Sequence, residues 1–112
     1  MEFRDRQSLL GFGCMRFPTN QEGALDVEGA MALLDLAYAG GVNYYDTAWP
    51  YHKGESEPLL GRWQETKPRE SLLLATKLPV WQVASQEEGE KLFSTQLERL
   101  RTGYVDLSLI HI

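Results

Sequence analysis

The sequence predicts an α/β protein in which parallel strands alternate with helices. Four short apolar runs alternate with three longer runs that carry apolar residues at helical spacing, in the order β-α-β-α-β-α-β. The connections between these runs are short, and parallel strands joined through helices need right-handed crossovers. Periodicity alone leaves two architectures open, an open doubly wound sheet or half of a (β/α)8 barrel.

The first half of the chain holds two predicted strands and one helix. Residues 9–14 (LLGFGC) predict a strand that runs into a glycine-containing loop. Asp26 is a predicted N-cap, because an Asp side chain accepts hydrogen bonds from backbone N–H groups of the first turn. The Gly40-Gly41 pair predicts the end of that helix. Residues 42–46 (VNYYD), rich in Tyr and apolar residues, predict the second strand.

The middle of the chain holds a second helix and a third strand. Ser56, with Pro58 in the following turn, predicts a helix that runs to about Trp63. Residues 68–70 (PRE) predict a turn. Residues 72–77 (LLLATK) are nearly all apolar, as expected for a strand that is covered on both faces.

A third helix and a fourth strand follow. Residues 85–88 (SQEE) form a capping box, in which a Ser side chain and a Glu three residues later bond the free N–H groups of a helix start. Gly103 is expected to end this helix. Residues 105–110 (VDLSLI) predict the fourth strand.

The positions of the motifs favour the barrel. A nucleotide-binding open sheet carries a Gly-rich phosphate loop after its first strand, directly before a helix. Residues 11–16 (GFGCMR) have two glycines but no third at the required spacing, and residues 15–18 (MRFP) do not begin a helix. We therefore expect residues 1–112 to be one incomplete domain, the N-terminal half of a parallel (β/α)8 TIM barrel with about four β/α units.

The composition excludes several classes of function. The net charge of −5 gives no broad basic surface for nucleic acid or anionic lipid. No apolar run approaches the roughly 18 residues of a membrane span, and residues 1–6 lack the apolar core of a secretory signal. The single cysteine, Cys14, excludes an intramolecular disulfide and suits a reducing compartment. We expect a cytoplasmic protein without a nucleic-acid or membrane partner.

Three consecutive predicted strands end on titratable side chains. Asp46 ends the second strand, Lys77 the third and His111 the fourth, while Tyr51 lies in the loop after Asp46. Taken singly, these residues have ordinary structural interpretations: a cap, a solvated lysine, a hydrogen-bonded histidine and a packed loop tyrosine. The C-terminal ends of parallel strands, however, lie at one edge of a sheet, where catalytic groups collect. We therefore expect the four side chains to surround one site, with Tyr44 on the same strand face as Asp46.

This group of side chains suits the protonation of a carbonyl oxygen. The phenol of a tyrosine has a pKa of about 10, too high for an effective acid at neutral pH, and a nearby ammonium lowers it. A carboxylate holds the lysine in place, and a histidine can donate to the substrate carbonyl or help to pass the proton. The arrangement protonates an oxygen while a hydride or another nucleophile adds to the carbonyl carbon.

Two other histidine and cysteine positions carry weaker signals. Cys14 is expected to be a small buried apolar residue, and His52 is expected to be solvated. A metal site formed by Cys14, Asp46 and His111 lacks any recognised ligand spacing, so no metal is expected.

At these residues the chain resembles the aldo-keto reductase superfamily. The matching segments are residues 10–16 (LGFGCMR), 41–48 (GVNYYDTA) followed by Tyr51, 54–57 (GESE) before 60–61 (LG), 75–77 (ATK) and 104–111 (YVDLSLIH). The resemblance implies a (β/α)8 barrel that reduces small aldehydes or ketones with NADPH or NADH. The resemblance implies that Tyr51 is the general acid and that Lys77 lowers the pKa of Tyr51. It also implies that Asp46 holds Lys77 in place and that His111 orients the substrate carbonyl. It also places Gly13, Cys14 and Met15, together with Asp46, beside the nicotinamide.

The sequence of residues 11–18, 51–57 and 75–81 looks most similar to a bacterial branch of that superfamily. Members of this branch carry a ferredoxin-like C-terminal extension with cysteine-ligated [4Fe-4S] clusters, for which this chain has no ligands. Family members are much longer, as a whole barrel requires, so the resemblance implies an N-terminal fragment. Two alternatives remain open: a non-catalytic fragment that associates with a second copy or with a missing C-terminal half, and a cofactor-sensing binding protein on the same fold.

Overall fold

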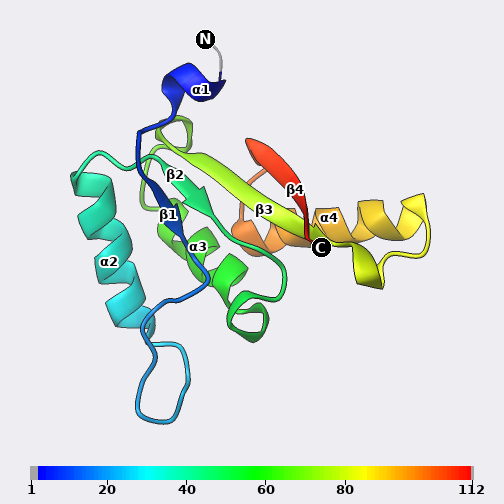
Figure 1. Ribbon diagram of the computed structural model, residues 1–112, viewed down its shortest axis with the longest axis horizontal. Coiled ribbons are helices and arrows are strands. Elements are labelled where there is room, and N and C mark those ends of the chain that lie inside the picture. Colours follow the sequence, from blue (N-terminus) through cyan, green and yellow to red (C-terminus); the bar gives the residue numbers. More distant parts are fainter. Residues whose placement is uncertain (1–2, 112) are drawn as a thin grey trace.

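The computed structural model describes residues 3–111, with side chains described for residues 5–109. Helices and strands alternate along the chain (Figure 1). In order, the elements are α1 (Phe3–Arg6), β1 (Gly11–Gly13), α2 (Val27–Ala39), β2 (Tyr44–Asp46), the 3-10 turn η1 (Tyr51–Gly54), α3 (Ser56–Gln64), η2 (Arg69–Ser71), β3 (Leu73–Pro79), η3 (Val80–Gln82), α4 (Gln86–Leu100) and β4 (Leu107–His111). None of the described helices is long and apolar enough to cross a membrane.

The order of the strands separates the two architectures that periodicity left open. The four strands are parallel and lie side by side in the order β1-β2-β3-β4. The three long helices α2, α3 and α4 lie on one side of this sheet (Figure 1). An open doubly wound sheet would reverse its strand order and carry helices on both faces. The expectation of a partial (β/α)8 barrel is therefore confirmed.

Alternate residues along the strands face the helices and form the hydrophobic core. Tyr45 of β2 is fully buried, and its ring centroid lies 4.8 Å from that of Trp63 on α3. The Trp63 indole N–H donates to Asp35 of α2 at 2.9 Å, which satisfies its polar atom at the edge of the core. The remaining buried members of this cluster are Cys14, Phe17, Ala30, Leu34, Leu59, Leu60, Leu72, Leu74 and Leu100. The intervening strand residues, such as Tyr44 and Asp46, face the opposite side of the sheet.

The predicted helix starts are confirmed. The Asp26 carboxylate accepts a hydrogen bond from the Gly29 N–H at 3.0 Å before α2. The Ser85 hydroxyl accepts from the Glu88 N–H at 3.2 Å before α4. α3 begins at Ser56, as predicted, but without a side-chain cap.

Several element ends differ from the prediction. The first strand covers only Gly11–Gly13, because β2 offers three register partners and Leu9 and Leu10 are exposed. α1 was not predicted. β3 continues to Pro79, because β4 pairs with it along that length. α4 ends at Leu100 and not at Gly103, since Arg101 itself adopts the left-handed conformation (φ 55°) and closes the helix with its own N–H.

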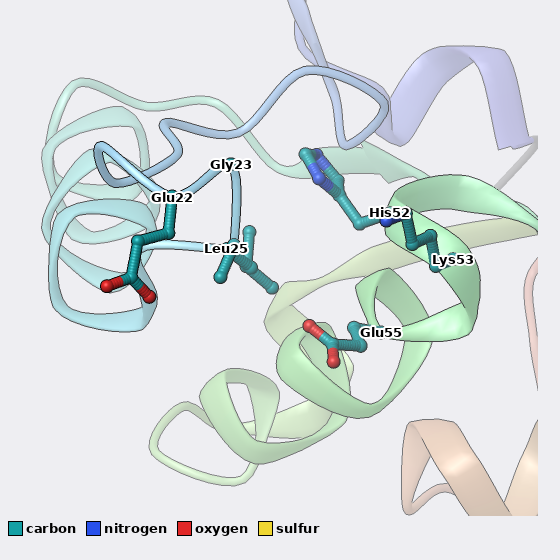
Figure 2. Close-up of a pocket in the computed structure, with 7 residues that line it drawn as sticks. Glu22, Gly23, Leu25, His52, Lys53 and Glu55 are labelled. Carbon is teal, nitrogen blue, oxygen red and sulfur yellow. The ribbon is translucent and has the colours of Figure 1, made fainter.

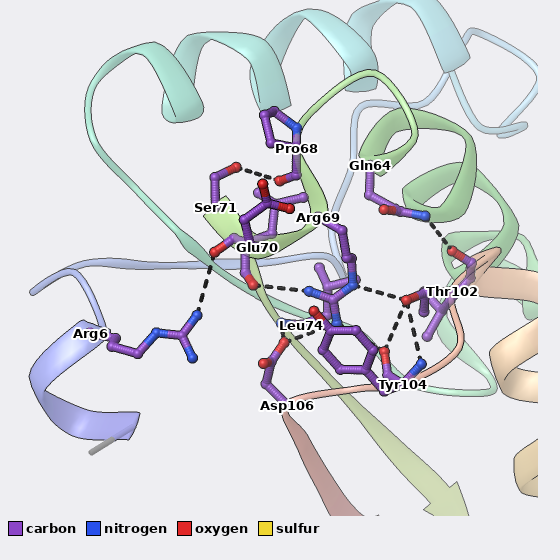
Figure 3. A network of polar contacts seen from close by, with 12 residues as sticks. Arg6, Gln64, Pro68, Arg69, Glu70, Ser71, Leu74, Thr102, Tyr104 and Asp106 are labelled. Atoms are coloured by element: carbon purple, nitrogen blue, oxygen red, sulfur yellow. Dashed lines mark hydrogen bonds and ion pairs between the residues drawn. The ribbon is translucent and has the colours of Figure 1, made fainter. Parts of the chain in front are cut away.

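Polar contacts around Arg69 join the ends of the strands that lie away from Asp46 and Lys77 (Figure 3). The Arg69 guanidinium donates to the Thr102 hydroxyl at 2.9 Å and to the Tyr104 carbonyl at 2.9 Å, and pairs with Asp106 at 3.0 Å. It also stacks on the Tyr104 ring, with Cζ 4.0 Å from the centroid. The same Asp106 oxygen accepts from the Leu74 N–H at 2.9 Å. This network ties the turn before β3 to the connection before β4.

Gly61 is expected to be essential for the packing of α3 against α4. Gly61 is buried, and a Cβ added there would lie 2.8 Å from the Leu100 carbonyl carbon and also clash with the Arg99 carbonyl oxygen. Because both obstacles are backbone atoms, Gly61→Ala should lower the free energy of unfolding by about 1–3 kcal/mol or more. Urea unfolding followed by circular dichroism measures this loss.

The matched control for this substitution is Gly103→Ala. An added Cβ at Gly103 meets nothing within 4 Å. Equal unfolding free energies for the two variants would show that the two helices do not approach each other as closely as described.

Candidate active site

The ends of β2 and β3 bring a carboxylate and an ammonium together. Asp46 is the last residue of β2, and Lys77 lies on β3 two residues after Ala75, the register partner of Asp46. The Lys77 ammonium forms an ion pair with Asp46 and donates to the Thr47 carbonyl oxygen at 3.1 Å. The two side chains are 18% and 25% exposed, so water screens their attraction only in part.

Tyr51 lies beside this ion pair. It is the first residue of η1, five positions after Asp46, and the Lys77 Nζ atom lies 4.9 Å from the centroid of its ring. Burial acts to lower the pKa of Lys77, but its hydrogen bonds to Asp46 and to Tyr51, together with their charges, raise the pKa above its ordinary value. Lys77 is therefore a cation at neutral pH, in contact with both the carboxylate and the phenol.

A second tyrosine supports the carboxylate from the same face of the sheet. The Tyr44 hydroxyl donates to the other oxygen of Asp46 at 3.3 Å. Burial and then the charge of Asp46 raise the pKa of Tyr44 to about 12. Tyr44 therefore stays protonated near neutral pH and acts as a donor. The shared strand face of Tyr44 and Asp46 was predicted from their spacing.

His111 is placed through its backbone alone. It is the last residue of β4 and the register partner of Pro79 on β3. Leu109, two positions before His111, is the register partner of Lys77. Its side chain lies outside the described residues. The assignment of His111 to the site therefore stays a prediction.

The loop after β1 begins beside Asp46. Gly13 is the register partner of Asp46, and a Cβ added at Gly13 would meet nothing within 4 Å. The Cys14 N–H donates to the Asp46 carbonyl at 2.8 Å, whereas the thiol is fully buried in the core below the helices. That burial raises the pKa of the Cys14 thiol well above its ordinary value. Met15 is 47% exposed. The Cys14 thiol is therefore not available to a ligand, whereas the backbone of this segment and the Met15 side chain are.

The thiol and the Asp46 carboxylate thus do not share a cluster. Within the described part of the chain, no group of three or more His, Cys, Asp or Glu side chains is arranged to hold a metal ion.

The expectation that His52 is solvated is wrong. Its Nε2 atom accepts a hydrogen bond from the Phe17 N–H at 2.8 Å, and its ring stacks on Phe17 with centroids 5.5 Å apart. Both His52 and Lys53 adopt left-handed backbone conformations, with φ of 53° and 56°, which turn this segment back toward the loop after β1. His52 therefore joins the loop after β1 to the segment that carries Tyr51.

A cavity of about 280 Å³ opens between these two segments (Figure 2). It is lined by residues 22–25 on one side and by His52, Lys53 and Glu55 on the other. None of Asp46, Tyr51 and Lys77 lines it. The cavity is therefore distinct from the ion pair, although both lie near the C-terminal ends of the strands.

A buried polar cluster lies on the helix side of the sheet, and sequence reasoning gave its members no role. Glu57 of α3 is fully buried and accepts from the Thr76 hydroxyl at 2.5 Å and from the Gln96 amide at 3.1 Å. Arg99 of α4 forms an ion pair with its other oxygen at 3.4 Å. Burial raises the pKa of Glu57, while Thr76, Arg99 and Gln96 oppose that rise. The available signal was Gln96, a polar residue on the apolar face of its helix.

Comparison with known proteins identifies relatives of this chain. The sequence matches the Aldo/keto reductase family over residues 9–112. It is 35% identical to norsolorinic acid reductase B of Aspergillus parasiticus, over 95% of this chain and 32% of that protein. It is 35% identical to aryl-alcohol dehydrogenase [NADP(+)] of Phanerodontia chrysosporium, over 80% of this chain and 28% of that protein.

A solved structure shows the same arrangement of elements. The aldo-keto reductase of Bacillus halodurans in its holo form is 31% identical and superposes with a TM-score of 0.76, over 91% of this chain and 35% of that one. The chain thus spans about a third of the length of the relatives it matches.

Proposed function

Because the chain belongs to the aldo/keto reductase family, we propose that it carries the proton-donating part of the active site of a nicotinamide-dependent carbonyl reductase. The observation that carries this proposal is the Lys77 ammonium, held between the Asp46 carboxylate and the Tyr51 phenol. The proposed substrates are small aldehydes and ketones, in keeping with one relative that is named a reductase and another that is named an alcohol dehydrogenase.

In the proposed mechanism, Tyr51 gives its hydroxyl proton to the carbonyl oxygen of the substrate, which becomes an alcohol. The Lys77 ammonium stabilises the phenolate that remains. Asp46 holds the ammonium in place and keeps it charged, and Tyr44 holds the second oxygen of Asp46. His111 is proposed to orient the carbonyl.

The residues after β1 fit one part of the cofactor. NADPH or NADH, when bound, supplies the hydride that adds to the carbonyl carbon. Gly13 has no side chain and Met15 is exposed, which leaves space for a flat ring beside Asp46. We therefore assign the contact with the nicotinamide to Gly13, Cys14, Met15 and Asp46. The relative named for NADP(+) favours NADPH.

The proposed site is completed by a further part of the barrel. Residues 1–112 supply four of the eight β/α units that a TIM barrel contains, and we propose that they act as its N-terminal portion. Residues 1–112 contain no Walker motif and no complete dinucleotide fingerprint to hold the cofactor phosphates.

The isolated chain is therefore expected to bind NADPH weakly or not at all. It is also expected to self-associate, because β4 would end the sheet with an unpaired edge that carries apolar residues such as Leu107 and Leu109. Fluorescence titration with NADPH and light scattering test the two expectations. A monodisperse monomer with micromolar affinity would contradict both.

The activity is tested in a chimaeric barrel in which residues 1–112 replace the matching part of the Bacillus halodurans relative. NADPH consumption with an aldehyde substrate is the expected result, and the isolated chain should show none. A chimaera that folds and binds NADPH, yet never turns over with any of a panel of aldehydes and ketones, would instead support a non-catalytic, cofactor-sensing role.

Two finer assignments stay proposals. We propose that the parent protein is cytoplasmic, because the single cysteine of residues 1–112 suits a reducing compartment. We also propose that it belongs to the bacterial branch with a ferredoxin-like [4Fe-4S] extension, on the sequence of residues 11–18, 51–57 and 75–81. The coding sequence downstream of Ile112 tests the branch, since a cysteine-rich extension would support it and its absence would remove it.

A further inference from the structure

We propose that Arg99 of α4 is a positioning residue for Tyr51, which it holds through the backbone on both sides of that tyrosine. The proposal rests on the proposed function, because it concerns the general acid of that reaction. In this assignment Arg99 acts on the loop backbone, so its role is to fix a loop and not to take part in proton transfer.

The contacts of Arg99 bracket Tyr51. One nitrogen of the guanidinium, Nη2, donates to the Trp49 carbonyl at 3.3 Å and to the Gly54 carbonyl. The guanidinium also stacks on the Trp49 ring, with Cζ 4.3 Å from the centroid. One side chain from a distant helix thus ties together the two ends of the segment 49–54, in the middle of which Tyr51 lies.

The guanidinium is itself held by the buried carboxylate of Glu57. Arg99 Nη1 lies 3.4 Å from Glu57 Oε1, an oxygen that is buried and accepts no hydrogen bond. The other oxygen is fixed by Thr76 and Gln96. A charge buried in this way must be compensated, so the Arg99 side chain, 17% exposed, is confined to one position. Glu57 therefore orients Arg99 toward the loop.

The loop needs an external restraint. His52 and Lys53, directly after Tyr51, are non-glycine residues in the left-handed region, a conformation that persists only where the surroundings enforce it. Gly54 follows with φ of 89°, and a Cβ added there would lie 3.2 Å from Arg99 Nη2. Glycine at position 54 therefore allows both the turn and the close approach of the guanidinium.

A pair of variants isolates the contribution of Arg99. Arg99→Met alone would leave the Glu57 charge buried without compensation and can fail to fold. The double variant Glu57→Gln/Arg99→Met removes both charges, and the single variant Glu57→Gln removes the carboxylate while keeping the bonds from Arg99 to the loop. Arg101→Met is the second control, because Arg101 pairs with exposed Glu65 outside this cluster.

Two measurements on these variants test the proposal. Hydrogen exchange of the full chain should be about tenfold faster or more in residues 49–55 of the double variant than in Glu57→Gln, because bonds from a charged donor are lost there. In the chimaeric barrel, kcat should fall roughly 100-fold, as expected for a catalytic group displaced by about 1 Å, while the KM for NADPH stays unchanged. Arg101→Met should match the parent in both.

The outcomes separate this proposal from the proposed function. The role of Arg99 would be overturned, and the proposed function kept, by either of two results. One is unchanged exchange in residues 49–55; the other is an unchanged kcat in the double variant while Tyr51→Phe is inactive. Full activity of Tyr51→Phe would instead overturn the proposed function, and the positioning role with it. A uniform rise in exchange over the whole chain would show that Arg99 stabilises the fold generally, and would also overturn the proposal.

Discussion

Tyr51→Phe is expected to abolish carbonyl reduction in the chimaeric barrel while NADPH binding stays nearly unchanged. The substitution removes one hydroxyl, the proposed proton donor, to which we assign no contact with the nucleotide. General acids contribute about 10²–10⁴-fold to the rate, so kcat should fall by at least that much. Steady-state kinetics with an aldehyde substrate and a separate NADPH titration measure the two quantities.

The matched control is Tyr104→Phe, which removes a phenol at the opposite end of the strands, where Tyr104 is 49% exposed. It should leave kcat unchanged. If Tyr51→Phe kept most of the parent kcat, Tyr51 would not be the acid, and the phenol beside Asp46, Tyr44, would become the group to test.

Lys77→Met is expected to damage catalysis almost as severely, because it removes the cation that we propose stabilises the Tyr51 phenolate. Without the cation the phenol should lose its proton less readily, so the alkaline limb of the pH–rate profile should shift to higher pH. The Asp46 carboxylate would keep Tyr44 as a donor but lose its ionic partner. The pH dependence of kcat/KM measures the effect, with Lys67→Met, which removes a lysine paired with Asp35 on α2, as the control.

Stability has a related dependence on pH. Because the folded pKa of Lys77 is raised, the stabilisation it provides is present below the ordinary lysine pKa of about 10.4 and is lost as the pH rises through the folded value. Lys77→Met should lack this alkaline loss.

An unchanged pH–rate profile in an active Lys77→Met variant would refute the coupling between Lys77 and Tyr51.

The sequence allowed the fold class and much of the candidate site to be predicted, because both depend on local patterns. Asp46 and Lys77 could be placed at one edge because each ends an apolar run, and parallel strands align those ends. Asp26 and Ser85 could be identified as helix starts from the chemistry of their own side chains and the residues that follow.

The features that were missed depend on contacts between distant segments. His52 was expected in solvent because its partner, the Phe17 N–H, is 35 positions earlier in the chain. Arg99 bonds a carbonyl 45 positions away, and no local pattern indicates a backbone acceptor. Gly103 was expected to end α4, but Arg101 ends it in the left-handed conformation, which shows that packing can override conformational preference.

The Arg69 network has a consequence for how this fold tolerates change. It fixes the starts of β3 and β4 with charged and backbone contacts that involve none of the loops at the other edge (Figure 3). The starts of β3 and β4 are thus fixed by this network, while residues 22–25 are held by contacts within their own loop, which include hydrogen bonds with Asn20 and the bridge between Thr19 and Leu25. Substitutions in the loops at the other edge should therefore leave this network intact, so that those loops and the sheet can change separately in evolution.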